Sequence, residues 1–385
     1  MIGTSERQQK NGQALADSEK ISIIMPVFRE SACLEGLLSH LIRDSYATKE
    51  ILVVVDEPTE YTMKLVKRFE KDVNFIINMK RKGKVGALNS TVHISSGQIL
   101  LFLDSDNVIT SNSVLMQVVA GMRGRDIVEF QLDALGNSFI AKLVGIEFAN
   151  ANLTNMLYSR YSARKPIIGG AAFAIRREAF FEIGGFRNFI TEDLDLGWRA
   201  FEKRKSYSHL DGVKIYTAVP TDLRSWISQR KRWSTGGAEW FSRNYRSIVT
   251  GTLKNMMSIT IPSFLILFPT AVLGIINLIL PGSIAEKVTV LMLLLLPFKA
   301  PQSGPAVFLL FSIMSIVRDF LSYGVGFAVS LLLTYAACRY TGRRFNIWEF
   351  AVYYFAYSPM TLLMFAYGLV RVVILRNLRL TDWKV

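Results

Sequence analysis

The sequence predicts an α/β domain with a mostly parallel sheet, followed by an α-helical transmembrane region. Between residue 21 and about residue 220, short runs rich in Val and Ile alternate with stretches of helical character. Strands buried on both faces and joined by helices produce this pattern. After about residue 250, the chain contains charge-free runs long enough to cross a bilayer. The composition, with 50% hydrophobic and 20% charged residues, excludes a disordered chain.

The first 220 residues divide into a tail and a domain. Residues 1–20 are polar and charged and lack an apolar core, so no secretory signal peptide is expected. The α/β domain is expected over residues 21–220. Its apolar runs are interpreted as strands at 21–28, 51–55, 73–77 and 99–103, with helical stretches at 32–43 and 60–71. Because ligands of such sheets bind beyond the carboxyl ends of the strands, functional residues are expected just after these runs.

A basic and aromatic segment over 221–250 connects the two halves of the chain. Trp226, Trp233 and Trp240 lie seven residues apart, near one face of a helix. The pair Gly236 and Gly237 is expected to interrupt that helix. A basic, Trp-rich segment that precedes a first membrane span is typical of an amphipathic element lying in the membrane interface.

Residues 251–385 are expected to form about four transmembrane helices. The stretches 259–280, 320–338 and 350–370 carry no charged residue, and each is about as long as the roughly 20 residues that a span needs. The stretch 284–317 remains open between two interpretations, one span with an interfacial helix or a re-entrant hairpin.

Charge and cysteine content exclude several classes of function. Lys and Arg exceed Asp and Glu by 45 − 31 = +14. Half of that excess falls in 251–385, with 11 basic and 4 acidic residues, so the charge is not the focused patch of a nucleic-acid-binding protein. Cys33 and Cys338 form neither a disulfide framework nor a zinc motif. We therefore expect membrane lipids, and no nucleic acid, among the partners.

Two carboxylates follow the predicted strand 99–103. Asp104 and Asp106 could bind a divalent cation that bridges a diphosphate, because Mg²⁺ accepts one or two carboxylates together with substrate phosphate oxygens. A loop or helix-cap role is the commoner origin of an Asp-x-Asp pattern. Because Asp104 and Asp106 follow the end of a strand, the cation site and the loop or cap role are about equally probable.

Two further clusters have both a functional and a plain interpretation. Asp56 and Glu57 end the strand 51–55, where they could recognise a base or ribose, or could simply be acids of a turn. Residues 81–89 place cations around Gly83, where a phosphate could bind. They do not form a Walker loop, and a solvated basic turn is the alternative.

The acids at 192–195 and the sequence Gln-Arg-Lys-Arg-Trp at 229–233 complete the candidate set. Glu192, Asp193 and Asp195 could complement a helix dipole, or one of them could act as a general base. The cations and the tryptophan at 229–233 could simply anchor the chain at a lipid surface.

The order of these features along the chain is more specific than any one of them. Over about residues 20–245 the sequence resembles the family 2 glycosyltransferases of the GT-A fold, most closely the membrane-bound polysaccharide synthases that make hyaluronan, chitin and cellulose. Gln-x-x-Arg-Trp after Glu-Asp is the most specific part of the match. The series that carries the resemblance comprises the acid at 56, the turn at 81–89, Asp104 and Asp106, Gly169 and Gly170, Glu192 and Asp193, and Gln229, Arg232 and Trp233.

The resemblance implies a site for a nucleotide-sugar donor. Asp56 corresponds to the acid that recognises the base, with Glu57 where the family usually has a second Asp. Lys84 corresponds to the cation near the donor diphosphate. Asp104 and Asp106 correspond to the nucleotide and metal acids, with Mg²⁺ or Mn²⁺ as cofactor and Asp106 as the more direct ligand.

The resemblance also implies the reaction centre and an acceptor site. Asp193 corresponds to the catalytic base. Gln229 and Arg232 are assigned to the donor diphosphate and Trp233 to the acceptor. Completing the acceptor site are Gly169, Gly170 and Glu192.

The function implied is a membrane-embedded, inverting and metal-dependent glycosyltransferase that extends a glycan. An alternative is a single transfer to a polyprenyl-phosphate or other lipid acceptor. A third hypothesis is a catalytically inert nucleotide-binding subunit, which would be expected to lack Asp106 or Asp193, and both acids are present. The expected location is the cell membrane, with several spans and a cytoplasmic catalytic domain.

Overall fold

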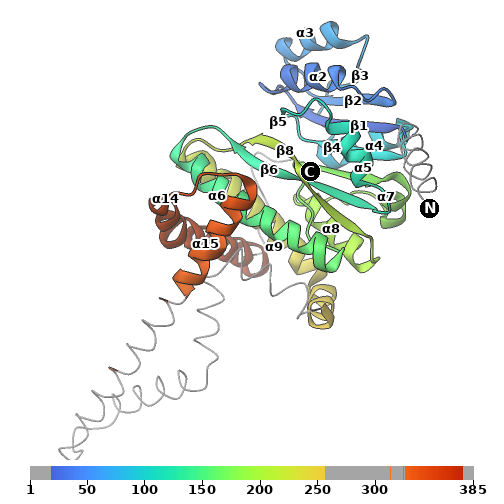
Figure 1. The fold of residues 1–385 in the computed structure, drawn as a ribbon. Helices are drawn as coiled ribbons and strands as arrows, with labels where there is room; N and C mark the ends of the chain where they lie inside the picture. Colours follow the sequence, from blue (N-terminus) through green and yellow to red (C-terminus); the bar gives the residue numbers. More distant parts are fainter. Residues whose placement is uncertain (1–18, 256–312, 314–323, 325, 376–385) are drawn as a thin grey trace, which may run out of the picture.

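The computed structural model describes residues 19–255, 313, 324 and 326–375 (Figure 1). Residues 19–255 fold around an eight-stranded sheet with the strand order β3-β2-β1-β4-β7-β6-β8-β5. Its strands are β1 (Ile21–Phe28), β2 (Lys49–Asp56), β3 (Asn74–Asn78), β4 (Ile99–Leu103), β5 (Asn107–Ile109), β6 (Ile127–Leu135), β7 (Ala172–Arg176) and β8 (Tyr207–Ala218).

The half of the sheet formed by β3, β2, β1 and β4 is parallel, as the sequence predicts. In register, Ile23 pairs with Ile51 on one side and with Leu101 on the other. The four predicted apolar runs coincide with these four strands to within two residues at each end. All four strands end at the same edge, and this edge carries Asp56 and, one residue after β4, Asp104.

The expectation of a mostly parallel sheet is wrong for the other half. Strand β7 runs antiparallel to both β4 and β6, and β5 runs antiparallel to β8, while β6 and β8 are parallel. The sheet is therefore mixed, with four parallel and three antiparallel pairings among the described strands. The apolar run of β7 looks like a parallel strand because burial on both faces erases the alternation that would mark an antiparallel one.

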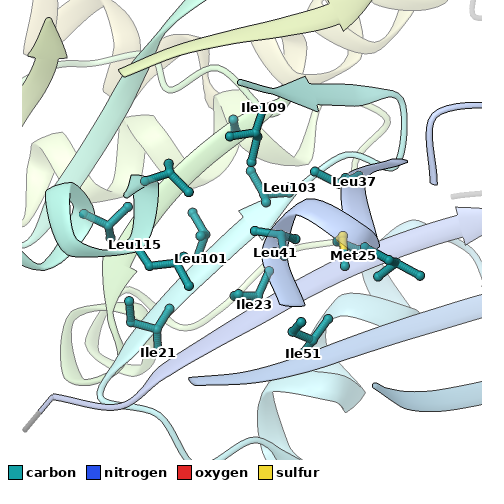
Figure 2. Packing of buried hydrophobic residues seen from close by; sticks show 14 of the residues in the cluster. Ile21, Ile23, Met25, Leu37, Leu41, Ile51, Leu101, Leu103, Ile109 and Leu115 are labelled. Carbon is teal, nitrogen blue, oxygen red and sulfur yellow. The ribbon is translucent and has the colours of Figure 1, made fainter. Parts of the chain in front are cut away.

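Helices cover both faces of the sheet. One core joins β1, β2 and β4 to α2, α3 and α5, and Figure 2 shows Leu41 of α2 over Ile23 and Leu101 in this core. The second core packs α4, α7 and α8 on the opposite face. The helices of this domain are α2 (Leu34–Arg43), α3 (Glu60–Phe69), α4 (Lys84–Ile94), α5 (Val114–Gly121), α6 (Phe139–Leu157), α7 (Arg177–Ile183) and α8 (Glu192–Glu202).

The basic, Trp-rich segment forms one helix, α9 (Leu223–Asn255), which continues through Gly236 and Gly237. The predicted interruption at these glycines is therefore wrong. A Cβ at Gly236 would lie 2.8 Å from the Cβ of Ile190. The glycine thus permits close packing of α9 against the loop that precedes α8, and this contact outweighs the helix-weakening tendency of glycine.

A long apolar helix spans Ile347–Ile374 and contains α14 (Ile347–Val352), α15 (Ser358–Leu369) and the wider turns η3 (Tyr353–Tyr357) and η4 (Val370–Ile374). Within the described ranges it is the one helix long and apolar enough to cross a membrane. It coincides with the span expected at 350–370. Residues 326–341 are also helical and overlap the stretch expected at 320–338. The expected segments 259–280 and 284–317 lie outside the described residues, apart from residue 313.

The apolar helix packs against the α/β domain as well as against α9. Contacts join α15 to α9 and α14 to α6, and Figure 1 shows these elements side by side. At the crossing, a Cβ on Gly368 would lie 2.5 Å from the backbone oxygen of Ser234. The absence of a side chain at Gly368 therefore allows the two helix backbones to approach closely.

Candidate active site

A cavity of about 460 Å³ opens at the carboxyl ends of β1, β2 and β4. It is lined by residues from the strand ends, from the 81–84 turn and from α9. Five of the predicted donor-site residues are among them, namely Asp56, Lys84, Asp104, Asp106 and Arg232. The structure thus gathers residues that lie up to 176 positions apart in the sequence at the edge where an α/β sheet is expected to bind its ligand.

Asp56, the last residue of β2, shapes one wall of the cavity. Its Oδ2 accepts hydrogen bonds from the backbone N–H groups of Lys82 and Gly83, both at 3.0 Å, and its Oδ1 accepts one from Asn78 at 2.9 Å. Gly83 adopts a φ of 88°, which glycine tolerates without strain. The carboxylate therefore fixes the turn that starts α4, and it retains lone pairs for a ligand.

Lys84 begins α4 and joins the two acidic groups of the site. Its Nζ lies 3.0 Å from Asp104 and 2.9 Å from Glu192. Burial alone would lower the pKa of Lys84, but the charges of Asp104 and Glu192 outweigh burial and raise that pKa above its usual range. The ammonium group therefore stays charged. Together with the N-terminus of α4 and Arg232, it makes this part of the cavity suited to an anion.

The pair Asp104 and Asp106 has the properties of a divalent-cation site. Burial, and then the charge of Asp104, raise the pKa of Asp106 to about 6. The Oδ1 of Asp106 is buried and lacks a hydrogen-bond partner in the described part of the chain. A cation would satisfy this oxygen and relieve the repulsion between the two carboxylates. In the described residues no group of three or more His, Cys, Asp or Glu side chains forms a metal cluster. Two carboxylates can hold Mg²⁺ or Mn²⁺ when substrate oxygens complete the coordination.

Asp193 is not among the residues that line the cavity, and it is fixed by two backbone hydrogen bonds. Gly170 N–H donates to its Oδ2 and Leu194 N–H to its Oδ1, both at 2.8 Å. Burial, and then the charge of Glu192, raise the pKa of Asp193 to about 7. Asp193 lines a small pocket of about 10 Å³ together with Gly170, Glu192 and others, and this pocket shares Lys84 and Asp104 with the cavity. A carboxylate with a pKa near neutrality is suited to accept a proton.

A buried ion pair beneath Gly169 escaped the sequence analysis. Glu129 of β6 accepts a hydrogen bond from Gly169 N–H at 2.5 Å, and its other oxygen binds Lys165. The side chains of Glu129 and Lys165 are only 4% and 9% exposed. The pair thus supports the Gly169–Gly170 segment that holds Asp193. The one sequence signal was a charged residue inside the apolar run of β6.

The signature residues of α9 separate into two groups. Arg232 lines the cavity, and burial lowers its pKa while Glu192 and Asp104 partly offset that effect. Gln229 and Trp233 are half-buried and are not among the cavity-lining residues. Trp233 instead packs against the guanidinium of Arg230, whose central carbon lies 4.6 Å from the centre of a Trp233 ring. Arg230 was not singled out from the sequence.

Part of the chain matches the model of a known protein family. Residues 22–184 match the model of the glycosyl transferase family 2. The fold, with its mixed sheet, is GT-A-like. The match covers the strands β1 to β7 and the cavity residues up to Asp106, whereas Asp193 and α9 lie beyond it.

The relatives extend over more of the chain. A protein of Sulfolobus acidocaldarius called a probable glycosyltransferase is 26% identical over 353 residues, 86% of this chain and 70% of that one. The poly-β-1,6-N-acetyl-D-glucosamine synthase of Staphylococcus epidermidis is 23% identical over 260 residues, 65% of this chain and 60% of the synthase. A solved mannosyltransferase of Pyrobaculum calidifontis, in complex with GDP-Man and Mn²⁺, has a TM-score of 0.47 at 16% identity and covers 84% of this chain and 87% of its own.

Proposed function

We propose that this family 2 glycosyltransferase domain moves a sugar from a nucleotide-diphosphate donor to a glycan acceptor at a membrane surface, with inversion at the transferred carbon. One observation carries the proposal. The cavity lining includes the carboxylates of Asp104 and Asp106 and the cations of Lys84 and Arg232, and a separate carboxylate, Asp193, has its pKa raised to about 7. A diphosphate leaving group and a proton acceptor are the two requirements of glycosyl transfer, and the two parts of this site meet them separately.

The donor diphosphate would lie at the start of α4. Lys84 and Arg232 supply positive charge there, and the helix N-terminus adds its dipole. Asp106, with Asp104, would hold Mg²⁺ or Mn²⁺, which supplies further charge stabilisation to the leaving diphosphate when it is bound. Asp56, beside the 81–84 turn, remains the proposed contact for the base.

Asp193 would take the proton of the acceptor hydroxyl. Glu192, its neighbour, is bound to Lys84 at 2.9 Å, so Asp193 is the carboxylate left for proton transfer. One carboxylate facing the sugar from the side opposite the leaving group supports a single displacement, and a single displacement inverts the configuration. Gly169, Gly170 and Trp233 remain the proposed acceptor surface, with Glu192 beside it. Gln229 stays a proposed donor contact that no described contact supports.

The acceptor could instead be a lipid, in a single-transfer reaction. A specific observation favours this second candidate. An apolar groove of about 230 Å³ lies between α9 and α15 and includes Leu194, the residue after Asp193. Its other lining residues are Ser234, Gly237, Ala238, Trp240, Phe241, Phe365 and Leu369. A hydrocarbon chain in this groove would bring a polar head group to the base. The synthase name of the staphylococcal relative favours a glycan acceptor.

We further propose that the protein resides in the cell membrane with several spans and its catalytic domain in the cytoplasm. The apolar helix Ile347–Ile374 supports this proposal, because it exposes large apolar side chains such as Leu363 and Ile374, which are 68% and 70% exposed. A cytoplasmic site would also meet nucleotide sugars, the proposed donors, where they are made.

A direct experiment tests both acceptor hypotheses. The full chain in membrane vesicles is incubated with a panel of nucleotide sugars and Mg²⁺ or Mn²⁺, with either oligosaccharide or polyprenyl-phosphate acceptors. A ladder of products supports glycan extension, and a single glycolipid product supports the second candidate. If no nucleotide sugar is consumed with either acceptor, the proposal is refuted.

The role of Trp233 is tested by Trp233→Ala. A lost stacking surface costs about 1–3 kcal/mol where aromatic rings stack on flat ligands. We expect transfer to an acceptor to decrease more than hydrolysis of the donor to water. An equal decrease of both rates would remove the acceptor role.

A further inference from the structure

Arg230 is the most completely enclosed cation of α9 and joins three separate parts of the chain. It is 4% exposed. Its two terminal nitrogens donate to the two carboxylate oxygens of Glu147 in α6, at 2.9 and 2.6 Å. One of them also donates to the hydroxyl of Tyr357 at 2.7 Å. Tyr357 belongs to the apolar helix Ile347–Ile374 and in turn donates to Glu147.

This cluster surrounds the guanidinium with aromatic rings. The central carbon of Arg230 lies 4.6 Å from the ring centre of Trp233 and 5.5 Å from that of Trp226. The Trp226 indole N–H donates to the same Tyr357 hydroxyl at 3.2 Å. Trp226 is 1% exposed, whereas Trp233 is half-buried and keeps part of its surface available. The buried Arg230 guanidinium thus forms the surface against which the more exposed Trp233 packs.

A buried ion pair contributes little net stability, because desolvation offsets most of its attraction. Its geometric effect is larger, since a forked arginine bound at two points leaves its plane little freedom. The plane of Arg230 is fixed in this way by Glu147 and Tyr357, and it faces Trp233 three residues later on the same side of α9. The Trp233 ring therefore packs on a guanidinium whose orientation is set by Glu147 and Tyr357.

We propose that Glu147 and Tyr357 are positioning residues for the transfer reaction, and that they act by holding Arg230 against Trp233. The inference rests on the proposed role of Trp233 in binding the acceptor. The inference also connects the apolar helix Ile347–Ile374 to the transfer reaction through Tyr357. The helix supplies the Tyr357 hydroxyl, so docking of that helix on α9 completes the acceptor surface but leaves the donor cavity unaffected.

Tyr357→Phe tests the inference in the full chain in membranes, and Tyr353→Phe is its matched control. Tyr353 is a buried tyrosine one turn earlier, stacked on Tyr357 with ring centres 5.4 Å apart, and its hydroxyl binds Asn150 at 3.4 Å. Both variants remove one buried hydroxyl from the same helix. The measured quantity is the ratio of acceptor glycosylation to donor hydrolysis, together with the acceptor KM.

Tyr357→Phe removes the hydroxyl that binds Arg230, Trp226 and Glu147. Loss of the restraint on Arg230 should lower that ratio by about two- to tenfold, mainly through a higher acceptor KM. Donor hydrolysis should stay unchanged. Tyr353→Phe should keep the wild-type ratio. Glu147→Gln, which acts from α6, should lower the ratio in the same direction. It keeps the inference testable if the tyrosine variant does not fold.

The outcomes separate this inference from the proposed function. If Trp233→Ala lowers the ratio but neither Tyr357→Phe nor Glu147→Gln does, the positioning role is refuted and the acceptor role stands. If Tyr357→Phe or Glu147→Gln lowers transfer and hydrolysis equally, the role of the substituted residue is structural and the inference is refuted. If Trp233→Ala leaves the ratio unchanged, the proposed acceptor role fails, and this inference fails with it.

Discussion

Gly170→Ala should disable the reaction without touching the donor cavity's cations. A Cβ at this position would lie 2.5 Å from Oδ2 of Asp193 and 3.0 Å from its Cγ, whereas ordinary contact begins at 3.4 Å. The carboxylate would have to retreat by about 0.9 Å, and a misplacement of about 1 Å in a reacting group can lower a rate by about 10²-fold. The retreat would also break the 2.8 Å hydrogen bond from Gly170 N–H.

The assay measures kcat for sugar transfer and, separately, the affinity for the nucleotide donor. We expect kcat to decrease about 10²-fold while donor affinity changes little. Gly36→Ala is the matched control, because no heavy atom lies within 4 Å of the added Cβ. In a helix this change should stabilise the fold by up to about 1 kcal/mol and leave the rate unaffected. A wild-type kcat in Gly170→Ala would refute the placement of Asp193 as the base.

Three further predictions follow from the same contacts. Because burial and Glu192 raise the pKa of Asp193 to about 7, the base loses its proton-accepting form as the pH falls below that value. kcat/KM should then fall about tenfold per pH unit, and a flat profile between about pH 5 and pH 8 would contradict the assignment. Asp106→Asn should abolish metal-dependent transfer, and full wild-type activity in excess chelator would remove the metal role. Gly368→Ala would place a Cβ 2.5 Å from Ser234 O, so thermal unfolding should show a loss of about 1–3 kcal/mol from overpacking at the contact between α9 and α15. An unchanged unfolding midpoint would show that the two helices are not packed as described.

The positions of the first four strands could be predicted because each is a continuous apolar run. Residues 21–28 and 99–103 coincide with β1 and β4 in full. The direction of β7 could not be predicted, because a strand buried on both faces has the same pattern in either direction. At Gly236, the low helix propensity of glycine predicts a break in the helix. The helix α9 is nevertheless continuous there, because the glycine permits close packing against Ile190.

The site was predictable where functional residues follow strands. Asp56 and Asp104 come at strand ends, and Lys84 starts a helix after β3, so their meeting follows from the parallel order of the strands. The supporting pairs were not predictable. Glu129 and Lys165 are 36 residues apart, and Glu147 and Arg230 are 83 apart, so no local spacing relates them. Their pairing depends on how α6, β6 and α9 pack, which hydrophobic patterns alone do not specify.

The central claim is that Asp193 is the base of a glycosyl transfer, and Asp193→Asn tests it most directly. The amide keeps the size of the side chain but cannot accept the proton. We expect donor affinity close to that of the unmodified protein, because the cavity proposed to bind the donor is lined by other residues. Transfer to the acceptor should fall by about 10²–10⁴-fold, the usual contribution of a general base. Transfer at the wild-type rate in the Asp193→Asn protein would contradict the account.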